Sequence, residues 1–208
     1  MYDYRLTQND LLVMFFNSIS VSDKLGYKSP VLKRMIKELY LRVGDARKLI
    51  GETRPKIPVP GYTTPDGKSV VLDEEYFSEE LQRFDLSGFT LHGEKVDEKI
   101  LLQSLIKVIQ QSEMDHELLG HSYSILSSKI EKLRRKIGKE LNLKKTKSND
   151  YEKESQRILL KRTEMIAYET QIKCANYRMK VCQNELTKRI WETWIIILKK
   201  QYNSLKVG

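Results

Sequence analysis

A heptad pattern runs through residues 102–137, which read LQSLIKVIQQSEMDHELLGHSYSILSSKIEKLRRKI. Residues recur alternately three and four positions apart along this stretch, which is the spacing of the buried seam of a coiled coil. The eleven seam positions, nine of which are apolar, are Leu102, Leu105, Ile109, Ser112, His116, Leu119, Tyr123, Leu126, Ile130, Leu133 and Ile137. The pattern predicts one long amphipathic helix.

A second run of the same spacing follows after a polar segment. It comprises Met165, Tyr168, Ile172, Ala175, Met179, Cys182 and Leu186, and then shifts by one residue to Ile190, Trp194 and Ile197. We interpret the shift as a local defect within one continuous helix. The polar, basic segment near 142–150 is the predicted turn between the two helices, so that residues 94–208 would form a long antiparallel coiled-coil hairpin.

The first 93 residues are expected to form a small helical head. Asn9 or Asp10 is placed to cap a helix over 11–19, and Pro30 suits the first turn of a second helix that extends to about Ile50. The predicted fold class is therefore mainly α, with head 1–93 and hairpin 94–208.

A proline-rich segment, 51–72, interrupts the head. Pro55, Pro58 and Pro60 exclude a helix there, and Thr64-Pro65-Asp66-Gly67 has the composition of a tight turn. We expect an extended segment with two short strands, 57–63 and 68–72, on either side of the turn. A short helix over 73–84 follows.

The positive charge of the chain is concentrated in one region. The net charge is +9, and residues 129–147 contain nine basic side chains against only Glu131 and Glu140. Such a cluster attracts an acidic protein surface or nucleic-acid phosphates, although it would also suit a solubilising helix tip. Tyr151 is the nearest aromatic residue, so base stacking has little support. The candidate contact residues are Lys129, Lys132, Arg134, Arg135, Lys136, Lys139, Lys144, Lys145 and Lys147.

The most hydrophobic stretch lies near the C-terminus and includes Trp191, Trp194, Ile197 and Tyr202. Packing against Leu11–Phe16 in the core is one interpretation, and a surface for a protein partner or for self-association is the other. The stretch is much shorter than the roughly 20 residues of a membrane span. Because the chain also has only two cysteines and no export signal, we expect an intracellular, cytoplasmic protein.

Metal and cofactor chemistry finds little support in the residue spacing. His116 and His121 are five residues apart and would not share a face of an α-helix, while Cys174 and Cys182 are eight apart. His116 at a seam position is better explained as a polar residue that sets the register of the coiled coil. Gly67-Lys68-Ser69 has the composition of the end of a phosphate-binding loop, but the first glycine of such a loop is not at the required spacing from it. We therefore predict no metal, no cofactor and no catalytic residue.

These observations favour a non-enzymatic structural or adaptor protein that acts in a larger intracellular assembly through coiled-coil and basic-tip contacts. The alternative is a nucleic-acid-binding protein that uses the cluster 129–147 on phosphates. Homo-oligomerisation is compatible with either function.

Overall fold

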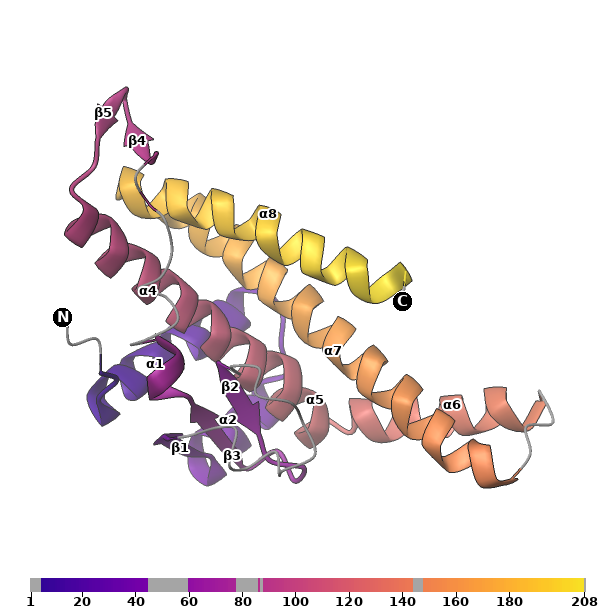
Figure 1. The fold of residues 1–208 in the computed structure, drawn as a ribbon. Helices are drawn as coiled ribbons and strands as arrows, with labels where there is room; N and C mark the ends of the chain where they lie inside the picture. Colours follow the sequence, from indigo (N-terminus) through magenta and orange to yellow (C-terminus); the bar gives the residue numbers. More distant parts are fainter. Residues whose placement is uncertain (1–4, 45–59, 78–85, 87, 144–147, 208) are drawn as a thin grey trace.

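The computed structural model describes residues 5–44, 60–77, 86, 88–143 and 148–207, and this part of the chain is mainly helical. The helices are α1 (Gln8–Lys24), α2 (Ser29–Glu38), α4 (Glu98–Asp115), the π-helix η3 (His116–Ser122), α5 (Tyr123–Leu126), α6 (Lys129–Leu143), α7 (Ser148–Val181) and α8 (Glu185–Val207). The strands are β1 (Tyr40–Val43), β2 (Gly61–Thr63), β3 (Ser69–Leu72), β4 (Thr90–Leu91) and β5 (Glu94–Lys95). Figure 1 shows α7 and α8 lying along the outside of the N-terminal elements.

Helix α1 begins earlier than the sequence indicated. Its cap is Thr7, and not Asn9 or Asp10: the Thr7 hydroxyl accepts from the Asp10 amide at 3.1 Å, and the Asp10 carboxylate accepts from the Thr7 amide at 2.9 Å. This reciprocal capping box satisfies two backbone donors that would otherwise lack a partner.

The predicted helix from Pro30 to Ile50 is wrong beyond Glu38. There the chain leaves α2 and enters β1, which pairs in parallel with β3 and places Tyr40 opposite Ser69. The apolar residues after Glu38 fit a strand as well as a helix. Pairing with β3 favours the strand, since it supplies backbone bonds such as Tyr40 N–H to Lys68 O at 2.9 Å. Residues 45–50 lie outside the described ranges.

The predicted turn and its flanking strands are confirmed where the chain is described. Strands β2 and β3 are antiparallel, and the Gly67 amide donates to the Thr64 carbonyl at 2.8 Å. Gly67 has a φ of +72°, a backbone conformation that favours glycine. The sheet order is β1-β3-β2, so the buried strand β3 lies in the middle. Residues 57–59 of the expected first strand are not among the described residues. Residues 74–77 of the expected helix 73–84 are helical, Asp73 precedes them, and residues 78–84 lie outside the described ranges.

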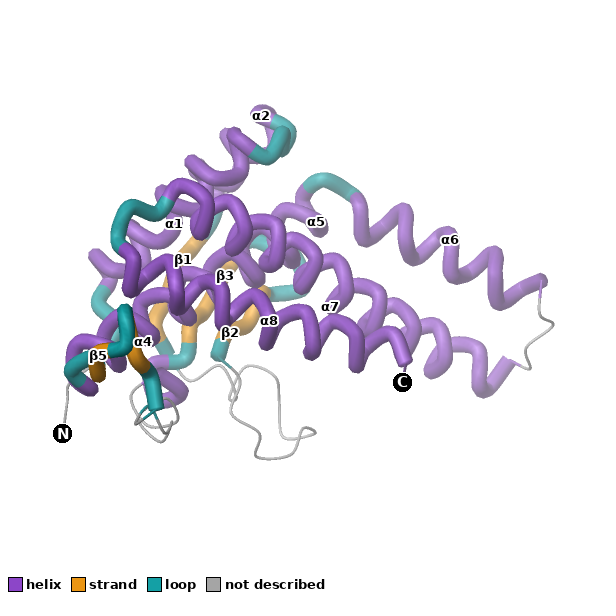
Figure 2. Tube along the Cα trace, turned by 90° about the horizontal axis from the view of Figure 1, so that it is seen from above, coloured by secondary structure: helices purple, strands orange, loops and turns teal. Residues whose placement is uncertain are grey.

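The first seam helix is interrupted rather than continuous. It starts at Glu98, after the cap Asp97, and passes through α4, η3 and α5. Ser128 then adopts a positive φ of 60°, and the chain restarts as α6. Helix α6 packs against α7, and in both views the paired ends of these helices extend beyond the body of the molecule (Figure 1 and Figure 2).

The second predicted arm is not one helix, because α7 ends at Val181. The Asn184 side chain then caps α8 by accepting from the Thr187 amide at 2.8 Å, and α8 folds back along α7. The one-residue shift in the apolar pattern therefore marks a helix end, and its interpretation as a local defect was wrong. The described residues therefore do not form two uninterrupted helical arms.

The hydrophobic core has two connected parts. The first joins apolar residues of α1, α2 and the sheet to α4, η3 and α7, and includes Leu11, Leu72 and Leu118. The second lies under α8, where Trp191 and Leu198 pack with residues of α4 and α7. The apolar C-terminal stretch thus contacts mainly α4 and α7, while Trp194 also packs against the cluster that includes Leu11 and Phe15. None of the helices in the described ranges combines the length and apolar composition needed to cross a membrane.

Candidate functional site

The π-helix η3 brings His116 and His121 together. Residues five apart point to different sides of an α-helix, but a π-helix bonds residue i to residue i+5 and so stacks them. The Nε2 atoms of the two imidazoles are 3.1 Å apart, and the ring centroids are 4.9 Å apart. The prediction that these histidines do not share a helical face is therefore wrong, and with it the spacing argument against a metal site.

Helix α7 supplies a carboxylate to the same point. Glu164 places Oε2 at 3.5 Å from His116 Nε2 and Oε1 at 3.6 Å from His121 Nε2. Gly120 makes this approach possible: a Cβ atom there would lie 2.6 Å from Ala167 Cα, so no larger residue fits between η3 and α7. Among the described residues, these two histidines and Glu164 form the one group of donors placed to hold a metal ion.

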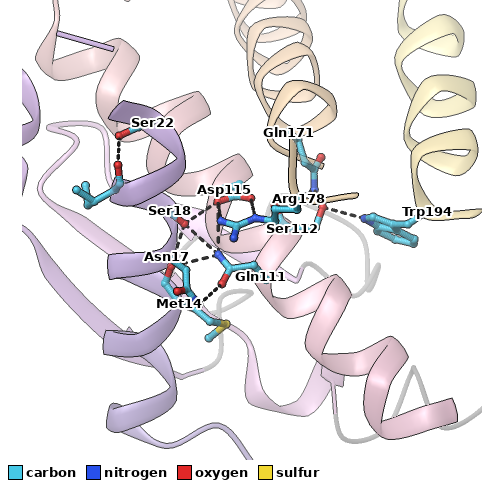
Figure 3. A network of polar contacts seen from close by, with 11 residues as sticks. Met14, Asn17, Ser18, Ser22, Gln111, Ser112, Asp115, Gln171, Arg178 and Trp194 are labelled. Carbon is cyan, nitrogen blue, oxygen red and sulfur yellow. Dashed lines mark hydrogen bonds and ion pairs between the residues drawn. The ribbon is translucent and has the colours of Figure 1, made fainter. Parts of the chain in front are cut away.

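A chain of hydrogen bonds fixes the orientation of the His116 ring. The Gln171 amide nitrogen donates to Ser112 O and Ser112 Oγ, at 3.1 and 3.0 Å, so its oxygen faces His116 Nδ1 at 3.1 Å. Nδ1–H therefore donates to Gln171, and Nε2 is directed toward His121 and Glu164. Trp194 from α8 extends the chain by donating Nε1–H to Ser112 Oγ at 2.8 Å (Figure 3).

Two further carboxylates, Glu113 and Glu117, are buried beside His116 on the same helical path. The Thr63 hydroxyl, on β2, donates to Glu117 Oε2 at 2.6 Å. Strand β2 comes close because Gly61 has no side chain: a Cβ there would lie 2.8 Å from Glu117 Cγ. Together with His116, His121 and Glu164, these residues line an open cavity of about 740 Å³.

The concentration of carboxylates changes the protonation of the cluster. Burial opposes the His116 cation, but the hydrogen bond to Glu164 and the charges of Glu113 and Glu117 outweigh it and raise the pKa of His116 to about 10. Burial and the neighbouring His116 lower the pKa of His121 to about 4. Burial, reinforced by neighbouring carboxylates, raises the pKa of Glu113 and of Glu117 to about 7.

A second polar network lies next to the cavity and joins α1, α4 and α7. The fully buried Asp115 carboxylate accepts two bonds from Arg178, at 2.9 and 3.0 Å, and one from Ser18 Oγ at 2.6 Å (Figure 3). Gln111 donates to the Met14 carbonyl at 3.1 Å. This network holds the helices that carry His116 and Glu164 at a fixed spacing.

The predicted basic cluster is located partly on α6. Its α6 members Lys132, Arg134, Arg135, Lys136 and Lys139 are exposed, and Arg134 and Arg135 both pair with Glu131, at 3.2 and 3.3 Å. The Lys129 ammonium lies 5.1 Å from the centre of the Tyr123 ring. Burial and two nearby lysines lower the pKa of Lys129. Lys144, Lys145 and Lys147 lie outside the described ranges.

The residues of the predicted apolar partner surface differ in their exposure to solvent. Trp191 is buried, Trp194 and Ile197 are half-buried, and the half-buried Tyr202 donates its hydroxyl to Glu169. Ile196, with 56% of its surface exposed, is the large apolar residue of this stretch that faces solvent.

The cluster around His116 did not follow from the heptad pattern, because that pattern predicts a regular helix through residues 116–122. The available signal was the density of histidines and carboxylates in residues 113–121, EMDHELLGH, at positions expected to be buried. Two of the five ionisable side chains there, Glu113 and Glu117, are one helical turn apart on either side of His116. No protein-family model matches the chain, and no similar curated protein or solved structure was found.

Proposed function

We propose that the protein is a non-enzymatic adaptor whose α6–α7 tip, defined as residues 129–143 and 148–162, binds an acidic surface on a protein partner inside a larger intracellular assembly. The observation that carries this proposal is the exposed basic face of α6 on a part of the molecule that extends beyond the body. Lys132, Lys136 and Lys139 contribute to that face, and a projecting surface with an excess of positive charge favours encounter with a partner of negative charge.

The tip is built as a pair of packed helices, which supports a contact of the coiled-coil type. Ile137 and Leu141 are buried, and Arg162 of α7 pairs with Glu140 of α6 at 2.8 Å. Leu160 on α7 is 48% exposed, so the tip combines positive charge with apolar surface. A segment with acidic residues beside an apolar stripe would complement both features.

Binding to nucleic-acid phosphates is the second candidate, since the same basic face would serve it. Stacking on bases has less support, because the Tyr151 hydroxyl donates to the Gly138 carbonyl at 3.2 Å and holds the ring against α6. Phosphate binding would therefore rest on charge alone and would fall steeply as salt is added.

The test uses the double charge reversal Lys132→Glu with Lys136→Glu. These exposed residues are four apart on α6 and belong to the basic face. The binding partner recovered with the wild-type chain should be lost with this variant, and the purified pair should bind at least tenfold more weakly. Affinity purification with quantitative mass spectrometry, followed by titration with the purified partner, provides the measurement.

The matched control is Lys199→Glu with Lys200→Glu, which makes the same change of net charge on α8, where both lysines are exposed. It should retain the partner. Equal loss with both double variants would show a general charge effect and would contradict the proposal. If a DNA or RNA duplex competes with the partner and binds with a steep salt dependence, the tip binds nucleic acid and the proposal of an acidic protein partner is wrong.

A further inference from the structure

We propose that His116, His121 and Glu164 form a binding site for one transition-metal dication of the zinc type, with a coordination position open to the cavity. The three side chains come from η3 and α7 and present two imidazole nitrogens and a carboxylate at one point. This set of donors is typical of zinc sites that keep one position free, and it is also used by non-haem iron. The proposal is independent of the function suggested for the α6–α7 tip.

The distances between donor atoms fit a tetrahedral ion. Zinc bonds of about 2.0–2.1 Å place neighbouring donors of a tetrahedron about 3.3–3.4 Å apart. Here the two nitrogens are 3.1 Å apart, and each lies 3.5 or 3.6 Å from an oxygen of Glu164. Small rotations of the half-buried His121 and Glu164 side chains would therefore complete the geometry without moving the backbone.

The residues behind His116 are those that a histidine ligand needs. A metal-bound histidine almost always donates its second N–H to a carbonyl or carboxylate, which fixes the ring and makes the other nitrogen a better ligand. Gln171 accepts this bond through its side-chain oxygen and is itself held by Ser112. The His116 ring is thus already oriented with Nε2 toward the other two ligands.

The surroundings of the site favour a dication and leave room for a further ligand. Glu113 and Glu117 line the same cavity, so their carboxylates would offset the charge of the ion. Tyr168 lies against the His116 ring, with centroids 5.0 Å apart, and closes one side. The cavity of about 740 Å³ is large enough for water or a small molecule at the fourth position. Two nitrogen donors disfavour Ca²⁺ and Mg²⁺, which prefer oxygen.

The first experiment titrates the full-length, tag-free, chelator-treated chain with Zn²⁺ and follows the heat of binding. We expect one Zn²⁺ per chain. His121→Gln and Glu164→Gln should each weaken binding by at least tenfold, because each removes a ligand. Gln171→Met should weaken it by about 10–100-fold while leaving all three ligands in place, as expected for a positioning residue.

The matched control is His92→Gln. His92 is exposed, lies on the β4–β5 hairpin and pairs with Glu185 at 3.0 Å, far along the chain from the site. This substitution should leave Zn²⁺ affinity unchanged. Circular dichroism and thermal unfolding of each metal-free variant establish that it is folded.

A second measurement needs no substitution. The chain has three histidines, so side-chain nitrogen NMR of the wild type can follow each of them during the titration. Zn²⁺ should shift the Nε2 signals of His116 and His121 and leave both signals of His92 in place. Anaerobic Fe²⁺ producing the same shifts would support the same site, with iron as its ion.

Four results would overturn the proposal, three of them from the Zn²⁺ and Fe²⁺ experiments. These three are the absence of Zn²⁺ and Fe²⁺ binding to the wild type, a shift confined to His92, and binding that is equally weakened by His92→Gln and His121→Gln. Mg²⁺ binding as tightly as Zn²⁺ would also contradict it, because the nitrogen donors would then play no part.

Discussion

Gly120 lies where η3 and α7 approach closely, and its lack of a side chain places Glu164 within reach of both histidines. A Cβ atom at this position would meet the backbone and the side chain of Ala167, at 2.6 and 2.7 Å. A glycine inside a helix normally lowers stability by about 1 kcal/mol relative to alanine. At position 120, packing against Ala167 reverses the usual preference for alanine over glycine.

Gly120→Ala should therefore destabilise the protein in spite of its better helix propensity. We expect the free energy of unfolding to fall by about 1–3 kcal/mol, because α7 must move away from η3. Urea unfolding measures the change. Gly88→Ala is the control, since a Cβ there meets nothing within 4 Å, and it should stay within about 0.5 kcal/mol of wild type. A stabilised Gly120→Ala protein would refute the close approach.

The two cysteines should differ sharply in reactivity. Cys174 is fully buried, and burial raises the pKa of its thiol, whereas Cys182 is half-buried at the end of α7. A thiol reagent at pH 8 should modify Cys182 first and Cys174 only as the chain unfolds. Labelling of Cys182→Ser, which keeps the buried thiol, isolates the slow reaction. Equal rates for both thiols in the native protein would count against the described core.

At the scale of whole elements, local patterns predicted the helices better than their ends. The turn around Gly67 followed from proline and glycine, and the packing of α6 against α7 was implied by their apolar seams. The end of α7 was missed because the sequence pattern resumes after a shift of one residue. Asn184, an ordinary cap, was the signal that a new helix begins there.

The site was less predictable than the helices, for a physical reason. Whether residues 116–122 form an α- or a π-helix is decided by packing against α7 and not by intrinsic helix preference. The seam correctly placed His116 in the interior, but its partner His121 faces the same point only after the helix widens. Glu164 is contributed from a helix more than forty residues further along the chain.

The packing of α4 against α7 should depend on Arg178 of α7, because its guanidinium neutralises the buried carboxylate of Asp115 on α4. Their side chains are 13% and 0% exposed. Arg178→Met leaves a buried carboxylate without its cation and should lower the free energy of unfolding by about 3–5 kcal/mol. Chemical unfolding at neutral pH gives the value.

Arg157→Met removes an exposed arginine that pairs with Glu154 on the surface of α7. This substitution should change the free energy of unfolding only slightly, because water screens ion pairs on the surface. If the two substitutions were equally mild, the Asp115–Arg178 pair would not hold the helices together.

At the scale of the whole molecule, the N-terminal residues and the long helices share one hydrophobic core. Leu11 of α1, Met35 of α2 and Leu72 of β3 belong to the same cluster as Leu118 of η3 and Cys174 of α7. The boundary predicted near residue 93 therefore passes through a set of residues that pack together. Stability should be a property of the full chain.

A fragment comprising residues 97–208 should consequently fail to fold cooperatively. It would expose the apolar faces of α4, η3 and α7 that α1 and the sheet cover. The full chain should show one sharp thermal transition, and the fragment a broad one with a weak near-ultraviolet dichroism signal. A fragment that unfolds at the same temperature as the full chain would establish two independent domains.

The widened turn at 116–122 makes the spacing of the two histidines sensitive to chain length. A π-helical turn accommodates one residue more than an α-helical turn, so deleting a single residue between His116 and His121 would let the helix become regular. The two rings would then be four apart and could still meet, but every side chain after them would rotate by about 100°. Natural variants of this protein should therefore tolerate substitutions in this turn far better than gain or loss of one residue.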